Sequence, residues 1–167
     1  MINVKVAFMD RDGTIVKDYP DNVWSSIEKP EFLDGSIDGL RALRDYGFEF
    51  IIITNQYLIE EGFITLEDYN RFHSLVLDKL KCDGINVLQT YYCPHKRSDN
   101  CECMKPNPGM INKALKEYMD INLDECILVG DSKCDLLLAK HFGLHAYMIT
   151  ESDLSLCEYN NYTQIKN

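Results

Sequence analysis

The sequence predicts an α/β fold in which a Rossmann-like parallel sheet is sandwiched between helices. Short apolar runs alternate along the chain with stretches whose apolar residues recur at the helical period, which is typical of βαβ units with right-handed crossovers. The runs are nearly continuous in apolar character, as expected for strands buried on both faces. We expect strands at residues 4–9, 48–53, 87–92, 126–130 and 145–150.

The stretches between these strands predict four helices. Gly47 and Gly143 suit the ends of the first and last helix, because glycine readily adopts the backbone that follows a helix. Thr65 and Asp68 form an approximate capping box at the start of the second. Pro108 suits the first turn of the third. The expected helices cover residues 36–46, a long stretch that begins at 65, 108–119 and 134–142.

A chain of 167 residues is most simply one domain, which we place at residues 1–150. The polar segment 151–167 is expected to be a poorly held tail. Residues 17–33 and 56–63 show little periodicity and are expected to be loops, the first carrying Trp24 as an anchor or as an aromatic that faces substrate.

Composition excludes several classes of protein. The formal net charge of −10 argues against a nucleic-acid partner, which would need a basic face. No segment has the apolar length of a membrane helix, and the N-terminus lacks the pattern of a secretion signal. The seven cysteines do not suggest a disulfide framework in such a chain. We expect a cytoplasmic protein that acts as a monomer.

Two carboxylates follow the first expected strand. Asp10 and Asp12 would lie at its carboxyl end, where a hard cation and a nucleophile could be held. A calcium loop of the EF-hand type is excluded, because aligning its invariant glycine with Gly13 places Phe8 and Tyr19 at positions that need ligand oxygens. An acidic turn without function remains the alternative.

Three polar residues elsewhere could bind a phosphoryl group. Thr54 and Asn55 follow the second expected strand, and their hydroxyl and amide could hydrogen-bond phosphoryl oxygens, although Thr-Asn is also ordinary in turns. Lys105, just before a turn fixed by proline, could neutralise a transferring phosphoryl group, and a solvated lysine is the alternative.

The fourth expected strand also ends in a carboxylate. Asp131 follows Gly130, which lets the backbone approach a ligand closely, and Asp135 lies one helical turn further on. Asp131 could bind a metal with the first aspartate pair, could cap the following helix, or could do both.

Three cysteines and a histidine gather in the loop of residues 93–103. Cys93, His95, Cys101 and Cys103 supply three thiolates and one imidazole, which matches a closed tetrahedral Cys₃His zinc site. Redox chemistry is the alternative, but C-x-C is not the C-x-x-C motif. Four filled positions leave no site for an activated water, so we expect a structural zinc. Lys96 and Arg97 in this loop are more simply solvated than bound to a substrate anion.

Together these motifs resemble the haloacid dehalogenase (HAD) superfamily of phosphatases. The resemblance rests on DRDGT after the first strand, Thr54 after the second, Lys105 and GDSKCD after the fourth. The loop CPHKRSDNCECMKPNPG is similar to the zinc-bearing branch, which includes D-glycero-D-manno-heptose 1,7-bisphosphate phosphatase and the histidinol-phosphate phosphatase domain.

The resemblance implies a role for each carboxylate of the site. Asp10 would attack phosphorus and form an aspartyl-phosphate, while Asp12 would protonate the leaving oxygen and later activate water. Asp10, the main-chain carbonyl of Asp12, and Asp131 would hold Mg²⁺, and Asp135 would support the metal and the catalytic lysine.

The resemblance also implies how substrate is bound. Thr54 and Asn55 would hold the phosphoryl group, and Lys105 would neutralise it. Family members carry cap domains after the first or second motif, but the loops at 17–33 and 56–63 are too short for one, so we expect no cap domain and an open site.

The expected function is therefore Mg²⁺-dependent hydrolysis of a small phosphorylated metabolite, such as a sugar phosphate. Met104, Glu60 and Glu61 replace residues of the heptose-bisphosphate pattern, which includes two arginines, and should weaken binding of a second phosphate. Histidinol phosphate is the alternative substrate, because an amine would suit the two glutamates. A catalytically idle binding module is the alternative of another class, and a polynucleotide 3′-phosphatase is disfavoured by the acidic charge.

Overall fold

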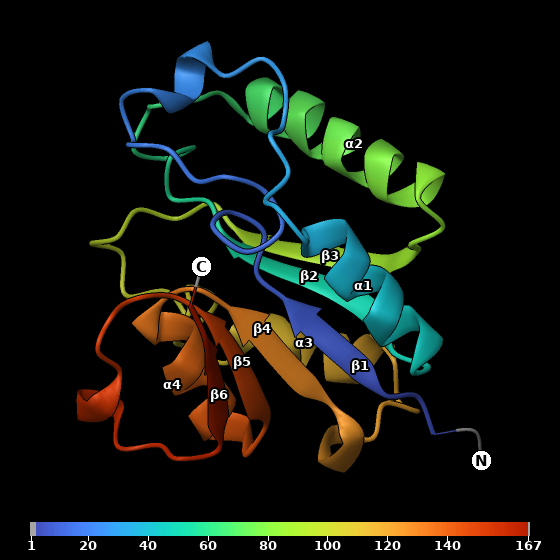
Figure 1. The fold of residues 1–167 in the computed structure, drawn as a ribbon. Helices are drawn as coiled ribbons and strands as arrows, with labels where there is room; N and C mark the ends of the chain where they lie inside the picture. Colours follow the sequence, from blue (N-terminus) through green and yellow to red (C-terminus); the bar gives the residue numbers. More distant parts are fainter. Residues whose placement is uncertain (1–2, 167) are drawn as a thin grey trace.

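The computed structural model describes residues 3–166, which form a six-stranded parallel sheet in the order β3-β2-β1-β4-β5-β6 (Figure 1). This confirms the predicted α/β fold. The strands are β1 (Val6–Met9), β2 (Glu49–Asn55), β3 (Val87–Cys93), β4 (Ile127–Gly130), β5 (His145–Ile149) and β6 (Tyr162–Ile165). The helices are α1 (Ser36–Asp45), α2 (Leu66–Cys82), α3 (Gly109–Glu117) and α4 (Lys133–Phe142), with short 3₁₀ turns at Trp24–Ser26, Leu123–Glu125 and Ser155–Cys157.

Helices cover both faces of the sheet, and each face has its own apolar core. Alternate residues of β1 point to opposite faces: Ala7 and Met9 belong to the core under α1 and α2, whereas Val6 and Phe8 belong to the core under α3 and α4. This two-sided burial explains why the central strands are apolar at successive positions.

The predicted helix ends are close to the observed ones. Thr65 and Asp68 form a reciprocal capping box at the start of α2, with the Asp68 amide donating to Thr65 Oγ1 at 3.0 Å and the Thr65 amide donating to Asp68 Oδ2 at 3.0 Å. Gly143 ends α4 in the left-handed region, with φ of 70°. Pro108 is the N-cap of α3, one residue before the first turn in which it was expected.

The expectation of a poorly held tail after residue 150 is wrong. Residues 162–165 form β6, which pairs in parallel with β5. Leu154 and Cys157, in the segment that leads to β6, are buried in the core on the α4 side. The sequence did not predict this strand because it has only four residues and two of them are polar. It lies at the edge of the sheet, and its alternate residues are exposed.

The topology fixes where a site can form. From β1 the chain moves outward to β2 and β3, then returns to place β4 on the other side of β1. Where the strand order reverses in this way, the loops at the carboxyl ends of the two strands diverge and leave a crevice. The crevice therefore lies beyond Met9 of β1 and Gly130 of β4.

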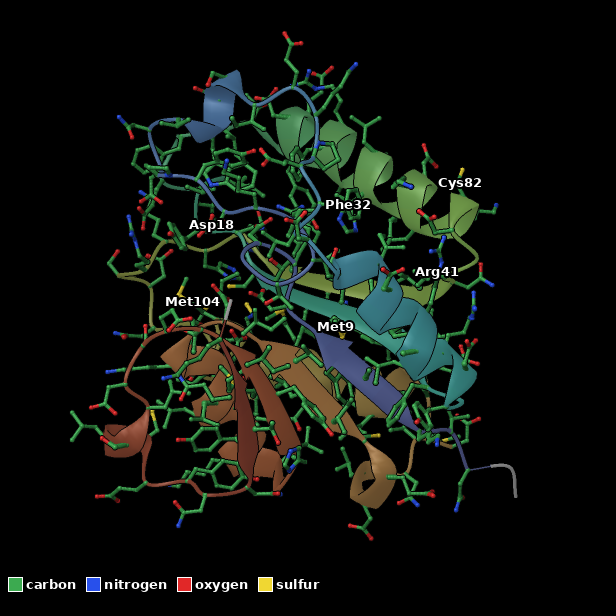
Figure 2. The ribbon with its side chains drawn as sticks, viewed as in Figure 1. Met9, Asp18, Phe32, Arg41, Cys82 and Met104 are labelled. Carbon is green, nitrogen blue, oxygen red and sulfur yellow. The ribbon has the colours of Figure 1, made fainter. Side chains whose placement is uncertain are left out.

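Loops surround this crevice. In the described part of the chain, residues 10–35 and 56–65 contain no separate domain over it; the first carries only a 3₁₀ turn. Figure 2 places Asp18, in the first loop, and Met104, just after the loop of residues 93–103 (the cysteine loop), at the end of the molecule toward which β1 points. None of the helices within residues 3–166 has the length and apolar character needed to cross a bilayer.

Candidate active site

Lys105 lies at the centre of the crevice, between two carboxylates from different elements. Its Nζ is 2.8 Å from Asp10 Oδ1, just past β1, and 2.7 Å from Asp135 Oδ1, in the first turn of α4. All three side chains are buried. Burial opposes the charged form of Lys105, but the field of Asp10 and Asp135 outweighs it and raises the pKa of the lysine above its usual value. The lysine is therefore a fixed positive charge inside the crevice.

Asp131 completes a cluster of carboxylates. One oxygen each from Asp10, Asp131 and Asp135 lies within 4.8 Å of the others. Burial, together with the neighbouring aspartates, raises the pKa of Asp131 to about 6 and that of Asp10 well above its usual range. A single lysine leaves this cluster with an excess of negative charge, and hard carboxylate oxygens are the ligands that Mg²⁺ prefers, so the donor set fits that ion.

Two glycines allow the carboxylates to come this close. A Cβ at Gly13 would overlap the carboxylate of Asp131, and the φ of 86° at Gly13 also disfavours any side chain. A Cβ at Gly130 would overlap Asp135. The glycines of the DRDGT and GDSKCD motifs are thus required by side-chain packing inside the site.

Asp135 also starts α4. Its Oδ2 accepts hydrogen bonds from Ser132 Oγ at 2.7 Å and from the Ser132 amide at 3.2 Å, which forms a capping box. Ser132 is therefore the N-cap of α4, and the alternative that Asp131 caps this helix is wrong. The carboxylate of Asp131 remains directed to the crevice beside Asp10.

Asp12 lies beside the carboxylate cluster and is held by two residues that the sequence analysis missed. Arg11 donates from Nε to Asp12 Oδ1 at 2.8 Å and from Nη2 to Oδ2 at 2.9 Å, and Gln56 Nε2 donates to Oδ2 at 2.7 Å. Arg11 is 1% exposed and lies within 6.0 Å of the ring centres of Trp24, Tyr69 and Phe72. Because Arg11 is buried among three aromatic rings, its guanidinium has little freedom to move. Arg11 therefore holds the carboxylate of Asp12 in one position.

Thr54 and Asn55 lie at the carboxyl end of β2, as predicted. Thr54 is buried, and its Oγ1 accepts from Gln56 Nε2 at 2.9 Å. The Asn55 amide pairs with the backbone of Lys105 in both directions, accepting from its N–H at 2.8 Å and donating to its carbonyl at 3.1 Å. Asn55 therefore fixes the segment that carries the lysine.

These groups line a pocket of 210 Å³. Its floor is the carboxylate cluster with Lys105, and its wall includes Asp18, which accepts from Trp24 Nε1 at 3.3 Å. Trp24 is thus both a loop anchor and a pocket residue. The pocket is lined by Asp10, Asp12, Asp18, Trp24, Thr54, Asn55, Tyr57, Leu58, Lys105, Asp131, Ser132 and Cys134.

A larger groove of 390 Å³ lies elsewhere, between α1 and the face of β4–β6 that no helix covers in Figure 1. Its walls are mostly apolar, and it holds neither the lysine nor the aspartate cluster. Chemistry therefore points to the smaller pocket as the active site.

The four predicted zinc ligands come together in the loop between β3 and α3. The sulfurs of Cys93 and Cys103 are 3.0 Å apart, and His95 Nδ1 is 3.1 Å from the Cys103 sulfur. All four ligand atoms, with the Cys101 sulfur, lie within 4.8 Å of one another. Three thiolates and one imidazole gathered at one point are ligands that zinc takes in closed tetrahedral sites, so this donor set fits that ion. All seven cysteines are free of disulfides.

Arg97, in the same loop, is not simply solvated. Its Nε and its backbone amide both donate to Glu61 Oε1 at 3.0 Å, and its guanidinium contacts Asp21 Oδ2 at 3.1 Å. The guanidinium also lies 4.1 Å from the ring centre of Tyr57, a pocket residue. One arginine thus joins the three loops that surround the pocket.

Comparison with known protein families agrees with this geometry. Residues 5–157 match the family described as polynucleotide kinase 3 phosphatase, which is most of the chain.

Among named relatives, the D-glycero-alpha-D-manno-heptose-1,7-bisphosphate 7-phosphatase of Photorhabdus laumondii is 38% identical over 148 residues, covering 84% of this chain and 79% of that protein. The histidine biosynthesis bifunctional protein HisB of Campylobacter jejuni is 30% identical over 158 residues, covering 94% of this chain but only 44% of that protein.

Solved structures lead to the same group. A D,D-heptose 1,7-bisphosphate phosphatase from B. bronchiseptica, complexed with magnesium and phosphate, superposes with a TM-score of 0.76 at 28% identity, over 87% of this chain and 80% of that one. A second, from Burkholderia thailandensis, has a TM-score of 0.65 at 19% identity, over 96% and 91%, and supports the fold alone. The matched family, the named relatives and the shared fold show that this chain belongs to the polynucleotide kinase 3 phosphatase family of HAD-type phosphatases.

Proposed function

We propose that this protein hydrolyses a small phosphomonoester, a sugar phosphate in the first instance, through an aspartyl-phosphate on Asp10. The observation that carries the proposal is the placement of Lys105 between Asp10 and Asp135, with Asp131 beside them, at the crevice where the strand order reverses. This arrangement offers a nucleophile and a fixed positive charge at one point, which phosphoryl transfer requires.

In the first step, an Asp10 oxygen attacks phosphorus while the bond from phosphorus to the leaving oxygen breaks. Asp12 gives its proton to that oxygen. In the second step, Asp12 takes a proton from water, the water oxygen attacks phosphorus, and the bond to Asp10 breaks to release phosphate. Arg11 and Gln56 hold Asp12 beside the pocket between these steps.

The remaining polar groups stabilise charge and position. Lys105 neutralises the phosphoryl oxygens, Thr54 hydrogen-bonds them, and Asn55 keeps Lys105 in place. Asp10, Asp131 and the main-chain carbonyl of Asp12 are the groups that would hold Mg²⁺, and Asp135 supports them. The metal would add further positive charge where the phosphoryl group is transferred.

Cys93, His95, Cys101 and Cys103 would hold a structural zinc. Because the protein fills all four positions, no position is left for substrate or for an activated water. The zinc would fix a loop that lies beside the pocket and has little apolar core of its own.

Heptose bisphosphate is the first candidate substrate, supported by the relative from Photorhabdus and the structure from B. bronchiseptica. Histidinol phosphate is the second candidate. The HisB relatives and the acidic side chains Asp18 and Glu61 near the pocket favour it, since an amine would be attracted there. A polynucleotide is disfavoured by the net charge of −10. Free cysteines suit the cytoplasm, where we place the enzyme as a monomer.

The test is Asp10→Asn, assayed by phosphate release from sugar phosphates and histidinol phosphate with Mg²⁺. We expect activity to fall on the order of 10³-fold or more, because the nucleophile is lost. Asp78→Asn, at an exposed position of α2, is the matched control and should retain full activity. Full activity of the Asp10 variant would exclude this residue as the nucleophile. A wild type that releases no phosphate from any of these compounds would favour an idle binding module.

A further inference from the structure

Arg97 is bound by carboxylates from two loops. Glu61 accepts from the Arg97 backbone amide and side-chain Nε, each at 3.0 Å, and also pairs with Nη2. Asp21 contacts the same guanidinium at 3.1 Å. Two negative charges therefore satisfy a single positive one, and the pair with Glu61 is bidentate, the geometry in which arginine binds carboxylate or phosphate best.

The arginine lies at the mouth of the active site. Its guanidinium lies over the ring of Tyr57, 4.1 Å from the ring centre, and Tyr57 is one of the residues that line the pocket. The Tyr57 hydroxyl donates to Asp21 Oδ1 at 3.0 Å, so that tyrosine, arginine and aspartate form one unit. A substrate long enough to extend past Tyr57 would meet this unit.

The pocket has no unpaired cation among its described lining residues, so binding of a second phosphate would depend on Arg97. Of the described residues that line the pocket, Lys105 is the only cation, and it is already paired with Asp10 and Asp135. A bisphosphate needs a second cation for the phosphate that does not react, because a dianion near Asp18 and Asp21 would otherwise be repelled. Arg97 is an exposed cation in contact with the pocket wall at Tyr57, whereas Arg11 is buried and paired with Asp12. Glu61 occupies the donor groups of Arg97.

We propose that Glu61 is a specificity-determining residue, which selects a substrate with one phosphate by occupying Arg97 in place of a second phosphate. The proposal rests on the phosphatase function proposed above and changes the order of its candidate substrates. It favours a monophosphate, such as histidinol phosphate, over the heptose bisphosphate that the named relatives suggest. A leaving group that is neutral or cationic suits the mouth as it stands, whereas a second phosphate must displace Glu61 from Arg97.

The test compares kcat/KM for fructose 1,6-bisphosphate and fructose 6-phosphate in the full chain with Mg²⁺. Glu61→Gln should raise the ratio of bisphosphate to monophosphate about tenfold, because the freed guanidinium can bind the second phosphate. Glu60→Gln is the matched control: Glu60 is the next residue, is exposed, and its side chain makes no hydrogen bond or ion pair in the described chain. Its ratio should stay within about twofold of wild type, a difference below 0.5 kcal/mol.

A third variant separates Arg97 from a general effect of charge. Adding Arg97→Gln to Glu61→Gln should abolish the gain. Equal gains for Glu60→Gln and Glu61→Gln, or an unchanged ratio in Glu61→Gln, would overturn the proposal, as would a gain that survives loss of Arg97. If the wild type turns over the two sugars too slowly to compare, dissociation constants of the same two compounds, measured on Asp10→Asn with and without Glu61→Gln, give the corresponding ratio. A wild type that cleaves no phosphomonoester contradicts the proposed function instead, and this is a different result.

Discussion

At the scale of single residues, the buried charges of Lys105, Asp10 and Asp135 depend on one another. Each would be costly to bury alone, and the two ion pairs of Lys105 compensate for that cost. Asp131 adds a further carboxylate without adding a cation, so the site without a metal remains too negative, and the pKa of Asp131 rises to about 6 through burial.

Replacing Lys105 with methionine should destabilise the Mg²⁺-free protein by about 3 kcal/mol, because the carboxylates lose their only ammonium. The loss should be larger at about pH 7.5 than at about pH 5.5. A carboxyl group whose folded-state pKa lies above its unfolded value costs stability as the pH rises through the folded pKa, and Asp10 and Asp131 are such groups. Lys105 lowers the pKa of both, so without it both pKa values rise further and the cost at the higher pH grows.

Urea unfolding at the two pH values measures this loss. Lys116→Met, at an exposed position of α3, is the matched control and should change little. A deficit in the Lys105 variant that is equal at both pH values would show that lost packing, and not charge, is responsible.

At the scale of elements, two capping boxes of the same type differ in what else they bind: both start a helix, but only the second also contacts Lys105. The box of Thr65 and Asp68 starts α2 on the surface, whereas that of Ser132 and Asp135 starts α4 at the candidate active site. In the second box one oxygen of the aspartate fixes the helix end and the other binds Lys105.

Thr65→Ala and Ser132→Ala should each lower the free energy of unfolding by about 1 kcal/mol, the usual cost of losing an N-cap side chain. Only Ser132→Ala should also reduce kcat/KM, by about tenfold, because Asp135 loses a 2.7 Å hydrogen bond and holds Lys105 less firmly. Chemical denaturation and steady-state kinetics measure the two effects. An equal loss of activity in both variants would mean that general stability controls the rate.

At the scale of the whole molecule, the candidate active site lies at one edge of the sheet, and three loops surround it. The strand order brings Asp10 and Asp131 together, while Arg97 connects the cysteine loop to Asp21 and Glu61 in the other two loops. The four predicted zinc ligands lie together in the cysteine loop.

Cys101→Ser should reduce bound zinc from about one per chain and lower Tm by about 5 °C or more, because metal binding contributes directly to folding. Adding Mg²⁺ should not restore Tm, since a hard cation does not replace zinc among thiolates. Elemental analysis and thermal unfolding check both points. Cys82→Ser, at an exposed cysteine of α2, is the control and should keep its zinc. A Cys101 variant with full zinc content would contradict the assigned ligand set.

The sequence was sufficient to predict those parts of the fold and of the candidate site that depend on a local pattern of residues. Asp10 and Asp131 could be placed because each follows a buried apolar run, and the carboxyl ends of parallel strands lie on one edge of a sheet. Arg11 could not, because its burial depends on Trp24, Tyr69 and Phe72, which come from distant segments. The pairing of Arg97 with Glu61, 36 residues apart, was hidden for the same reason. Strand β6 was missed because its polar, edge-strand pattern does not differ from that of a loop.

Strand β6 protects the edge of β5 in the folded protein. Its four residues pair with the outer N–H and C=O groups of β5, and no strand of the described chain lies beyond it. Local opening of β6 exposes the edge of β5, to which a second molecule could add a strand. We therefore expect changes that weaken β6 to promote aggregation while the rest of the sheet is still folded.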